Sequence, residues 1–343
     1  MRAQDVRPAL GAWSAWHDRD APVRLGISGC LLGEAVRYDG GHKRDAFLVD
    51  ELGRWVEWVS VCPEVELGMG VPRPNVDLVE IGSDGASELR MLSPRTGEDF
   101  TARMNAFARK RVAALREVEL DGYVLKKSSP SCGLARVKVH GPKGLPRKDG
   151  VGLFARALLE AWPHLPVEEE GRLADPVLRE NFVERIFCRQ RWRTLVAGPR
   201  TRTRLVAFWT AHKMLVRAHD EAGYRRVGRL LGSAPKSERG ERGARDLYAR
   251  FEAELFAALA IKSTRKKHTN VLQHALGYLR EALDEGERAQ LVLAIEDYRR
   301  GLLPLVVPLS LLRFQIVKHG IEYLQAQLYF DPHPKELMLR NRV

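Results

Sequence analysis

The chain contains only four cysteines among its 343 residues, and no two of them are spaced as a Cys-x2–4-Cys pair. Structural zinc sites usually take their thiolates from such pairs, so the spacing does not favour one. No apolar run reaches the roughly 18–20 residues that a membrane-spanning helix requires. Residues 1–22 carry charges and tryptophans where a signal peptide has its apolar centre. We therefore expect a cytoplasmic protein that keeps its thiols reduced and does not enter a membrane.

Length and charge indicate two domains with different partners. A chain of 343 residues commonly forms two domains, and an apolar content of 45% is ordinary for a globular protein. Residues 1–165 hold 24 basic and 22 acidic residues, whereas residues 166–343 hold 32 and 22. The excess of positive charge in the second half favours a polyanionic partner. A generally basic, arginine-rich proteome is the alternative explanation.

Strand-like and helical patterns alternate in the first half of the chain. We predict buried strands and helices, in chain order, at Val23–Ser28, Asp45–Trp55, Val56–Val61, Thr101–Val118, Tyr123–Lys126 and Gly152–Trp162. Such alternation is typical of an α/β fold in which a parallel sheet is flanked by helices. We assign residues 21–168 to this α/β domain and residues 1–20 to an N-terminal extension.

After Pro176 the pattern changes to long helical segments without a strand candidate. The predicted helices are Val177–Val196, Arg202–Ala222, Ala244–Ala260, Thr264–Asp284, Gly286–Gly301 and Leu309–Leu328. Residues 169–343 are therefore expected to form an all-α domain. The polar segment Ser233–Gly243 is predicted to be a loop.

Three of the four cysteines follow apolar stretches and lie in turn-rich sequence. Cys30 and Cys62 come at the ends of two predicted strands, and Cys132 lies in the loop after the third. The carboxyl ends of parallel strands meet at one edge of a sheet, where ligands commonly bind, so the three thiols are expected to meet there. Thiolates bind soft metals and iron–sulfur clusters. Buried, inert cysteines are the alternative, and this is the preferred interpretation for Cys188, which lies inside a predicted helix.

Polar residues near these cysteines are candidates for proton transfer and substrate positioning. Glu64 follows Cys62 by two residues, close enough for its carboxyl group to move a proton for a reacting group. Asp39 lies in an Asp-Gly turn, and the Ser131 hydroxyl beside Cys132 can donate to sulfur or substrate. Each has an ordinary structural alternative, with Glu64 as a solvated charge at a strand end and the other two as turn formers.

Basic residues gather in two stretches of the second half. Arginines interleaved with Trp192 form the first, and a basic run at the start of a later helix forms the second. Such side chains neutralise phosphates, and an aromatic ring can stack on an unpaired base. A solvated helix face is the alternative for either cluster alone, but two clusters in one basic domain favour contact with RNA or DNA. The candidate contact residues are Arg189, Arg191, Arg193, Arg200, Arg202, Arg204, Arg265, Lys266 and Lys267.

The segments around the three cysteines resemble a known family. Ile27-Ser-Gly-Cys-Leu-Leu-Gly33, Val61-Cys-Pro-Glu-Val65 and Ser129-Pro-Ser-Cys-Gly133 are similar to the motifs of the thiouracil desulfidase family, formerly DUF523. Lys267-His-Thr-Asn-Val-Leu-Gln-His274 and Tyr298-Arg-Arg-Gly-Leu-Leu-Pro304 resemble the YbgA-type domain, formerly DUF1722. The combination looks like the two-domain RNA desulfidases that act on 4-thiouridine in tRNA.

The resemblance implies a [4Fe–4S] cluster held by Cys30, Cys62 and Cys132, with one iron left to bind the sulfur of the substrate. That iron would act as a Lewis acid while water attacks the ring carbon, with no net redox change. Glu64 is the expected acid–base group, and Ser131 or Asp39 is expected to position the substrate. The helical domain would then hold the tRNA.

Two alternatives stay open at this point. The first is a desulfidase for free thiouracil or a related thiolated base, in which the helical domain serves another purpose. The second is a nucleic-acid-binding or repair protein with a structural cluster, which requires a fourth protein ligand such as Cys188. The charge of the second half favours the RNA desulfidase, because a free base needs no basic helical domain.

Overall fold

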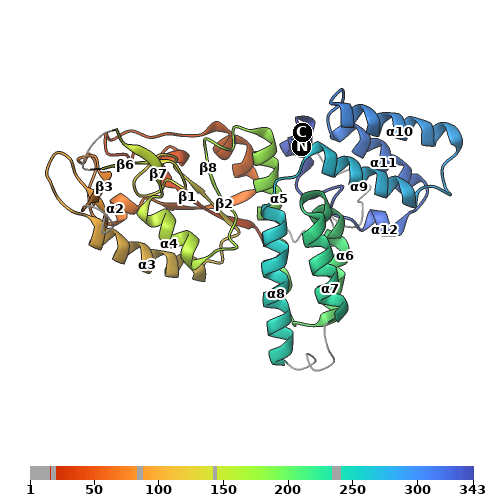
Figure 1. Cartoon of the computed structure of the whole chain (residues 1–343), viewed down its shortest axis with the longest axis horizontal. Helices are drawn as coiled ribbons and strands as arrows, with labels where there is room; N and C mark the ends of the chain where they lie inside the picture. Colours follow the sequence, from red (N-terminus) through yellow and green to blue (C-terminus); the bar gives the residue numbers. More distant parts are fainter. Residues whose placement is uncertain (1–15, 17–20, 83–87, 142–144, 234–240) are drawn as a thin grey trace, which may run out of the picture. The chain divides into compact units, whose positions relative to one another are not determined.

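The computed structural model describes Trp16 and residues 21–82, 88–141, 145–233 and 241–343 (Figure 1). The chain forms two compact units. We call Pro22–Ala174 the sheet unit, and Asp175–Val343 together with Trp16 and Ala21 the helical unit. The expected α/β region followed by an all-α region is confirmed. Among the described residues, no helix is long and apolar enough to cross a membrane.

A four-stranded parallel sheet in the order β2-β1-β5-β8 forms the centre of the sheet unit. β1 (Val23–Ser28) pairs with β2 (Val56–Val61) on one side and with β5 (Gly122–Leu125) on the other, and β8 (Val167–Glu169) completes the edge. β1 and β5 are almost entirely buried, as expected for strands covered on both faces. Because all four strands are parallel, their carboxyl ends share one edge of the sheet.

β8 places the boundary between the units later than the sequence indicated. The expected boundary after residue 168 falls inside this strand, whose residues pair with β5 and therefore belong to the sheet. The helical unit begins at Asp175, whose side chain accepts hydrogen bonds from two backbone amides of the first helical turn. Most of the expected extension, residues 1–20, lies outside the described residues. Trp16, which is described, packs edge-on against Phe208 of the helical unit.

Helices cover the sheet. α3 (Thr101–Glu117) and α4 (Leu153–Ala161) lie side by side, and their apolar residues join those of β2 and β5 in one core (Figure 1). The helix expected within residues 45–55 is a π-helical turn, Phe47–Glu51, followed by the 3-10 turn Leu52–Arg54. A single helical turn, α2 (Pro63–Glu66), follows β2.

A second sheet, which we did not predict, has the order β4-β3-β6-β7. β3 (Asp77–Ile81) pairs antiparallel with β4 (Glu88–Leu92) and parallel with β6 (Val137–His140), which pairs antiparallel with β7 (Arg147–Gly150). Its apolar side chains form a separate small core with residues of α3 and α4. β4 and β6 alternate apolar and charged residues over only four or five positions, and β7 contains no apolar residue, so the sequence signal for these strands is weak.

The helical unit consists of helices built around one aromatic-rich core that includes Trp192, Phe208 and Phe251. Two predicted helices end earlier than expected, at His219 and Tyr278, and the last is divided in two. Residues 234–240 of the predicted loop lie outside the described residues, whereas Ser233 and residues 241–243 are helical and not part of a loop. The helices are α5 (Pro176–Ala197), α6 (Arg202–His219), α7 (Glu221–Ser233), α8 (Glu241–Ala260), α9 (Arg265–Tyr278), α10 (Glu285–Arg300), α11 (Val306–Lys318) and α12 (Glu322–Gln325).

Candidate active site

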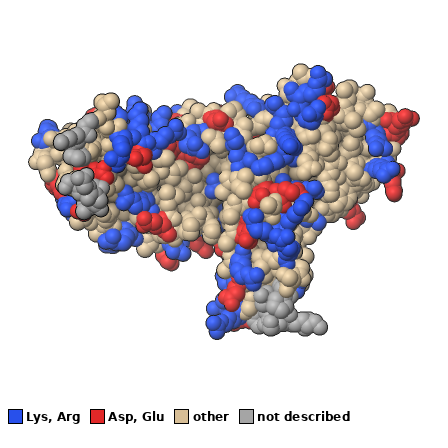
Figure 2. Space-filling view, viewed as in Figure 1, with Lys and Arg blue, Asp and Glu red and all other residues tan. Residues whose placement is uncertain are grey.

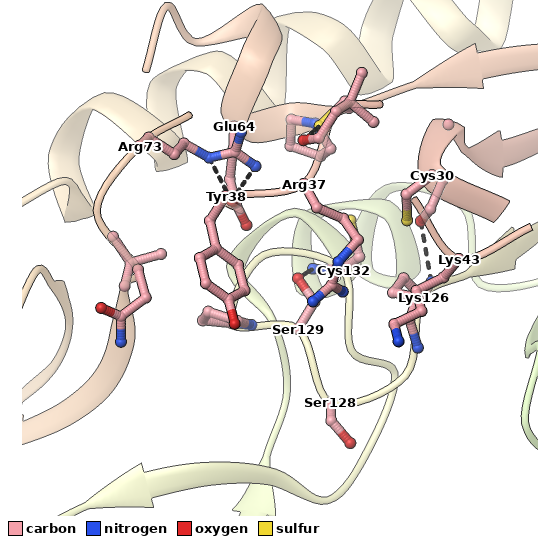
Figure 3. A pocket seen from close by; sticks show the side chains of 18 of the residues that line it. Cys30, Arg37, Tyr38, Lys43, Glu64, Arg73, Lys126, Ser128, Ser129 and Cys132 are labelled. Atoms are coloured by element: carbon pink, nitrogen blue, oxygen red, sulfur yellow. Dashed lines mark hydrogen bonds and ion pairs between the residues drawn. The ribbon is translucent and has the colours of Figure 1, made fainter. Parts of the chain in front are cut away.

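Three cysteines from neighbouring strand ends line one cavity of about 400 Å³, which we call the cysteine cavity (Figure 3). Cys30 lies in the 3-10 turn directly after β1, Cys62 caps α2 directly after β2, and Cys132 lies in the loop after β5. Because β1 lies between β2 and β5, their carboxyl ends bring the three thiols to one place. The structure thus gathers the three cysteines that the sequence singled out.

The environment of the thiols suits a cation. Cys30 and Cys132 are buried and Cys62 is half-buried, and none of them forms a disulfide. Burial raises the pKa of Cys30 to about 11 and also raises the pKa of Cys62 and of Cys132. Three thiolates in this cavity therefore need a positive charge between them, and a bound metal supplies one.

The first turn of α4 holds the loop that carries Cys132. The amides of Phe154 and Ala155 donate to the carbonyl oxygen of Ser131, at 3.0 and 3.1 Å. The backbone N–H groups of a helix's first turn have no acceptor within the helix, so they can donate to a neighbouring loop. Gly152 approaches the loop so closely that a Cβ atom there would lie 2.4 Å from the same oxygen. Glycine at this position therefore fixes where the third thiol lies.

Glu64 is held at the cavity by two partners. The Arg73 guanidinium donates to Oε2 of Glu64 from Nε at 2.9 Å and from Nη2 at 2.6 Å (Figure 3). The Ser131 hydroxyl donates to Oε1 at 2.7 Å. The Arg73 side chain is only 3% exposed and that of Glu64 14%, so this ion pair is screened little by solvent. The carboxylate is thus fixed beside the three thiols and lines their cavity.

Arg73 is a site residue to which the sequence analysis gave no role. Its backbone amide donates to the carbonyl of Tyr38 at 2.9 Å, and its Nη1 donates to the carbonyl of Gly70 at 3.0 Å. These contacts join the turn before β3 to the wall of the cavity. The sequence signal for Arg73 is its position between Pro72 and Pro74. The two prolines restrict the backbone on both sides and so help to orient the charged side chain between them.

The opposite side of the cavity is basic. Cys30, Lys43 and Lys126 lie on one side of the view in Figure 3, and Tyr38, Glu64 and Arg73 lie on the other. Lys126 forms an ion pair with Glu170, and the amide of Lys43 donates to the carbonyl of Cys30 at 2.8 Å. Cationic side chains here favour substrates or leaving groups that carry negative charge.

Ser131 and Asp39, the two predicted positioning residues, do not line the cysteine cavity. Ser131 is fully buried, and its hydroxyl contacts Glu64. The side chain of Asp39 is 46% exposed and forms an ion pair with Arg37, at 3.3 Å. Its hydrogen bonds with Arg37 and the amide of Gly41 lower the pKa of this carboxyl group. Both residues therefore act on neighbours that line the cavity.

The prediction that Arg191 contacts nucleic acid was wrong. Its side chain is 1% exposed and lies in the core of the helical unit. Nε contacts Nε2 of His212 at 3.0 Å, and Nη1 donates to the carbonyl of Pro332 at 3.0 Å. A guanidinium buried in this way cannot reach a phosphate. α5 carries polar residues on its buried sides, so helical spacing alone did not distinguish Arg191 from its exposed neighbours.

Several other predicted contacts are bound within the protein. Arg189 forms an ion pair with Glu252 and is 13% exposed. Lys267 donates to the carbonyl of His219 at 2.6 Å. The remaining predicted contacts that are exposed at the surface are Arg200, Arg202, Arg265 and Lys266. Arg193 and Arg204 are half-buried.

A buried ionic network ties the end of the chain to α5. Arg340 donates to Glu180 and to Glu184, each at 2.8 Å, and Nε2 of His219 lies 2.9 Å from the second oxygen of Glu184. Glu180, Glu184 and His333 offer ligand atoms within 4.8 Å of one another, as a metal site would. The guanidinium already bridges both carboxylates, so we interpret this cluster as a structural ion pair.

Two family models match the chain, one in each unit. Residues 25–170 match the model for 2-thiouracil desulfurase, and residues 213–334 match that for DUF1722, a protein of unknown function. The uncharacterised protein YbbK of Bacillus subtilis (strain 168) is 30% identical over 148 residues, which cover 42% of this chain and 95% of YbbK. The uncharacterised protein YbgA of Escherichia coli (strain K12) is 29% identical over 157 residues, which cover 46% of this chain and 90% of YbgA.

A solved structure is also similar. The [4Fe-4S]-dependent thiouracil desulfidase TudS has 29% sequence identity, covers 44% of this chain and 93% of its own, and gives a TM-score of 0.36. The family match and the cysteine cavity define the class of this protein as an enzyme that cleaves carbon–sulfur bonds. The chain belongs to the 2-thiouracil desulfurase family and carries a DUF1722 region in its helical unit.

Proposed function

We propose that this protein is a [4Fe–4S]-dependent desulfidase that converts 4-thiouridine in tRNA to uridine. The observation that carries the proposal is the meeting of three thiols and one fixed carboxylate in a single cavity. Sulfur donors suit iron, and the burial of the thiols calls for a cation among them. The three cysteines therefore fit a [4Fe–4S] cluster, which is the cofactor in the name of the relative TudS.

Cys30, Cys62 and Cys132 would hold the cluster, and an iron without a protein thiolate would supply a Lewis acid for the thiocarbonyl sulfur. The overall reaction replaces the C–S bond of the base by C–O, takes up one water and releases sulfide, with no net oxidation or reduction. The residues of the chain supply proton transfer and orientation to this reaction.

Glu64 is the group that accepts a proton from the attacking water. A carboxylate is a suitable base when it is fixed within hydrogen-bond reach of the water. Arg73 and Ser131 each hold one of its oxygens, and these bonds fix the orientation of the group. Ser131 is thus a positioning residue, because its hydroxyl contacts Glu64 and not the cavity.

The choice of tRNA as substrate is supported by charge and by domain composition. The second half of the chain holds 32 basic and 22 acidic residues. This excess of positive charge can bind the phosphates of an RNA, whereas a free base carries no phosphate. Free thiouracil is the second candidate substrate, because the matching family model is described as a 2-thiouracil desulfurase.

The test is incubation of the anaerobically reconstituted full chain with 4-thiouridine-containing tRNA and, separately, with free 2-thiouracil. Nucleoside and base analysis by liquid chromatography follows the loss of sulfur. We expect uridine to replace 4-thiouridine in the tRNA. Turnover of the free base alone would support the second candidate, and turnover of neither would contradict both.

A further inference from the structure

A second cavity adjoins the cysteine cavity within the sheet unit. It has a volume of about 630 Å³ and shares Asp77, Lys127, Ser128 and Pro130 with the cysteine cavity. The shared segment 127–130 leads directly to Cys132. A ligand that places one end at the thiols can therefore extend along this second cavity, which we call the basic cavity.

Four cations line the basic cavity without carboxylate partners among the described residues. They are Lys127, Arg136, Lys138 and Lys148, and all four are exposed. Figure 2 shows Lys and Arg side chains gathered over the region of β6 and β7, the strands that carry the last two. Exposed cations of this kind attract phosphates.

Lys138 and Lys148 stand directly opposite each other in the register of β6 and β7. Like charges at such a cross-strand position destabilise a sheet. Arg147, the next residue on β7, shows the usual arrangement, because it forms ion pairs with Glu80 at 2.7 Å and with Asp149 at 3.1 Å. Arg147 is thus balanced by carboxylates, whereas the two lysines have no carboxylate partner among the described residues. This difference favours an anion from outside the protein as the partner of the lysines.

Backbone strain is found at the same cavity. Ser128 and Arg136 both line it, and both have left-handed backbone angles, with φ of 60° and 54°. Residues other than glycine adopt this conformation at a cost of about 1 kcal/mol or more, and such residues cluster at ligand sites. Here the strain places one basic side chain and one hydroxyl at the cavity wall.

The carboxylates of the basic cavity do not cancel its charge. Glu169 is buried, and its Oε1 accepts from the amide of Leu134 at 2.9 Å and from that of Ala135 at 3.4 Å. Asp77 lies 3.9 Å from His140. Arg172 is paired with Glu168 at 2.6 Å and is excluded from the four cations counted above.

We propose that the basic cavity binds the phosphodiester backbone of the RNA next to the thiolated nucleotide. This inference rests on the proposed function and deepens it, because it places RNA contacts on the sheet unit itself. A base reaches the thiols only if its nucleotide is turned out of the stack, and phosphates on either side must then be held. The four cations beside the cysteine cavity are placed to hold them.

The test compares the full-length double variant Lys138→Gln/Lys148→Gln with the matched control Arg147→Gln. Binding of 4-thiouridine-containing tRNA is measured by fluorescence anisotropy between 50 and 200 mM salt. We expect the double variant to bind tRNA about tenfold more weakly than the wild-type protein. The negative slope of log K against log salt should become shallower by about two. The control should keep the tRNA affinity and the salt slope of the wild-type protein.

Unchanged tRNA affinity and salt slope in the double variant would overturn the inference. Misfolding is separated by thermal unfolding, because removing a repulsive cross-strand pair should leave the melting temperature equal or higher. The binding measurement does not depend on turnover. A wild-type protein that desulfidates no tRNA would therefore defeat the proposed function, whereas wild-type binding by the double variant would defeat the role of this cavity.

Discussion

The Ser131 hydroxyl donates a 2.7 Å hydrogen bond to Oε1 of Glu64, joining loops that are 67 residues apart in the sequence. Ser131 immediately precedes Cys132, and Glu64 follows Cys62 by two residues. The bond therefore couples two of the cysteine loops through the proposed proton acceptor. A shift of either loop moves the carboxylate as well as a thiol.

Glu64→Gln should separate proton transfer from cluster binding. The substitution keeps the size of the side chain but removes its basicity, so we expect desulfidation to fall by about 100- to 10,000-fold. The visible absorbance of the reconstituted cluster should stay unchanged, because Glu64 is not a thiol ligand. Glu57→Gln, at an exposed position on β2, is the control and should be fully active. A wild-type rate in Glu64→Gln would remove this residue from the mechanism.

Single substitutions of the cysteines should divide them into two classes. Cys30→Ser, Cys62→Ser and Cys132→Ser should each lose iron and visible absorbance after anaerobic reconstitution, because each removes a thiolate from the shared cavity. Cys188→Ser should retain the cluster, because Cys188 is packed in the core of the helical unit. Full iron content in any of the first three variants would disprove the ligand assignment.

Gly152→Ala should disturb the third thiol without touching a ligand. The added Cβ would lie 2.4 Å from the Ser131 oxygen and 2.9 Å from the amide nitrogen of Cys132, both backbone atoms that move only with the loop. We expect a loss of about 1–3 kcal/mol in unfolding free energy and a lower iron content. Gly228→Ala in α7 has open space around it, so it should leave the iron content unchanged and raise the unfolding free energy by up to about 1 kcal/mol, because alanine favours a helix over glycine. Normal iron content in Gly152→Ala would show that the loop tolerates the shift.

Acid should destabilise the helical unit. Burial lowers the pKa of His268 from 6.5 to about 3, so below pH 6.5 the unfolded chain binds a proton that the folded chain does not. Stability is therefore lost as the pH falls from 6.5 towards 3, by about 2 kcal/mol at pH 5. Glu184 extends the loss to lower pH. Burial alone would raise its pKa, but the hydrogen bond with His219 and the charge of Arg340 outweigh it and lower the pKa to about 2.

Urea unfolding at pH 7.5 and pH 5.0, followed by tryptophan fluorescence, measures this difference. The wild-type unfolding free energy should be smaller at pH 5.0. His268→Gln should show a smaller difference between the two pH values, although burial also lowers the pKa of His212, which contributes in the same direction. An equal difference in variant and wild type would exclude His268 as a source of the acid sensitivity.

The buried strands and the cysteine ends were predictable from sequence, because their apolar runs and turn residues are local signals. β1 and β2 begin and end where predicted, and β5 differs by one residue at each end. The second sheet was not predictable in this way. β7 consists of Arg147–Gly150, whose charged residues form a strand only because β6 lies beside it.

The partners of the site residues depended on tertiary contacts that no local pattern encodes. Glu64 was identified from its distance to Cys62, but the role of Arg73 required the fold to bring it against that carboxylate. Arg191 carried the same composition signal as its exposed neighbours, yet α5 turns it towards the core. The charge of a sequence segment thus does not show which of its side chains face solvent.

The order of the strands sets the order in which the protein can mature. β5 pairs with β8, and the Cys132 loop is hydrogen-bonded to the first turn of α4. Both α4 and β8 come later in the chain, and β8 ends at Glu169. The contacts that hold the third thiol are therefore complete only after the chain has been synthesised as far as Glu169. Metal sites built from cysteines on one short loop can capture their ion earlier. Here the geometry of the site depends on the formation of α4 and β8 as well as on the three cysteines.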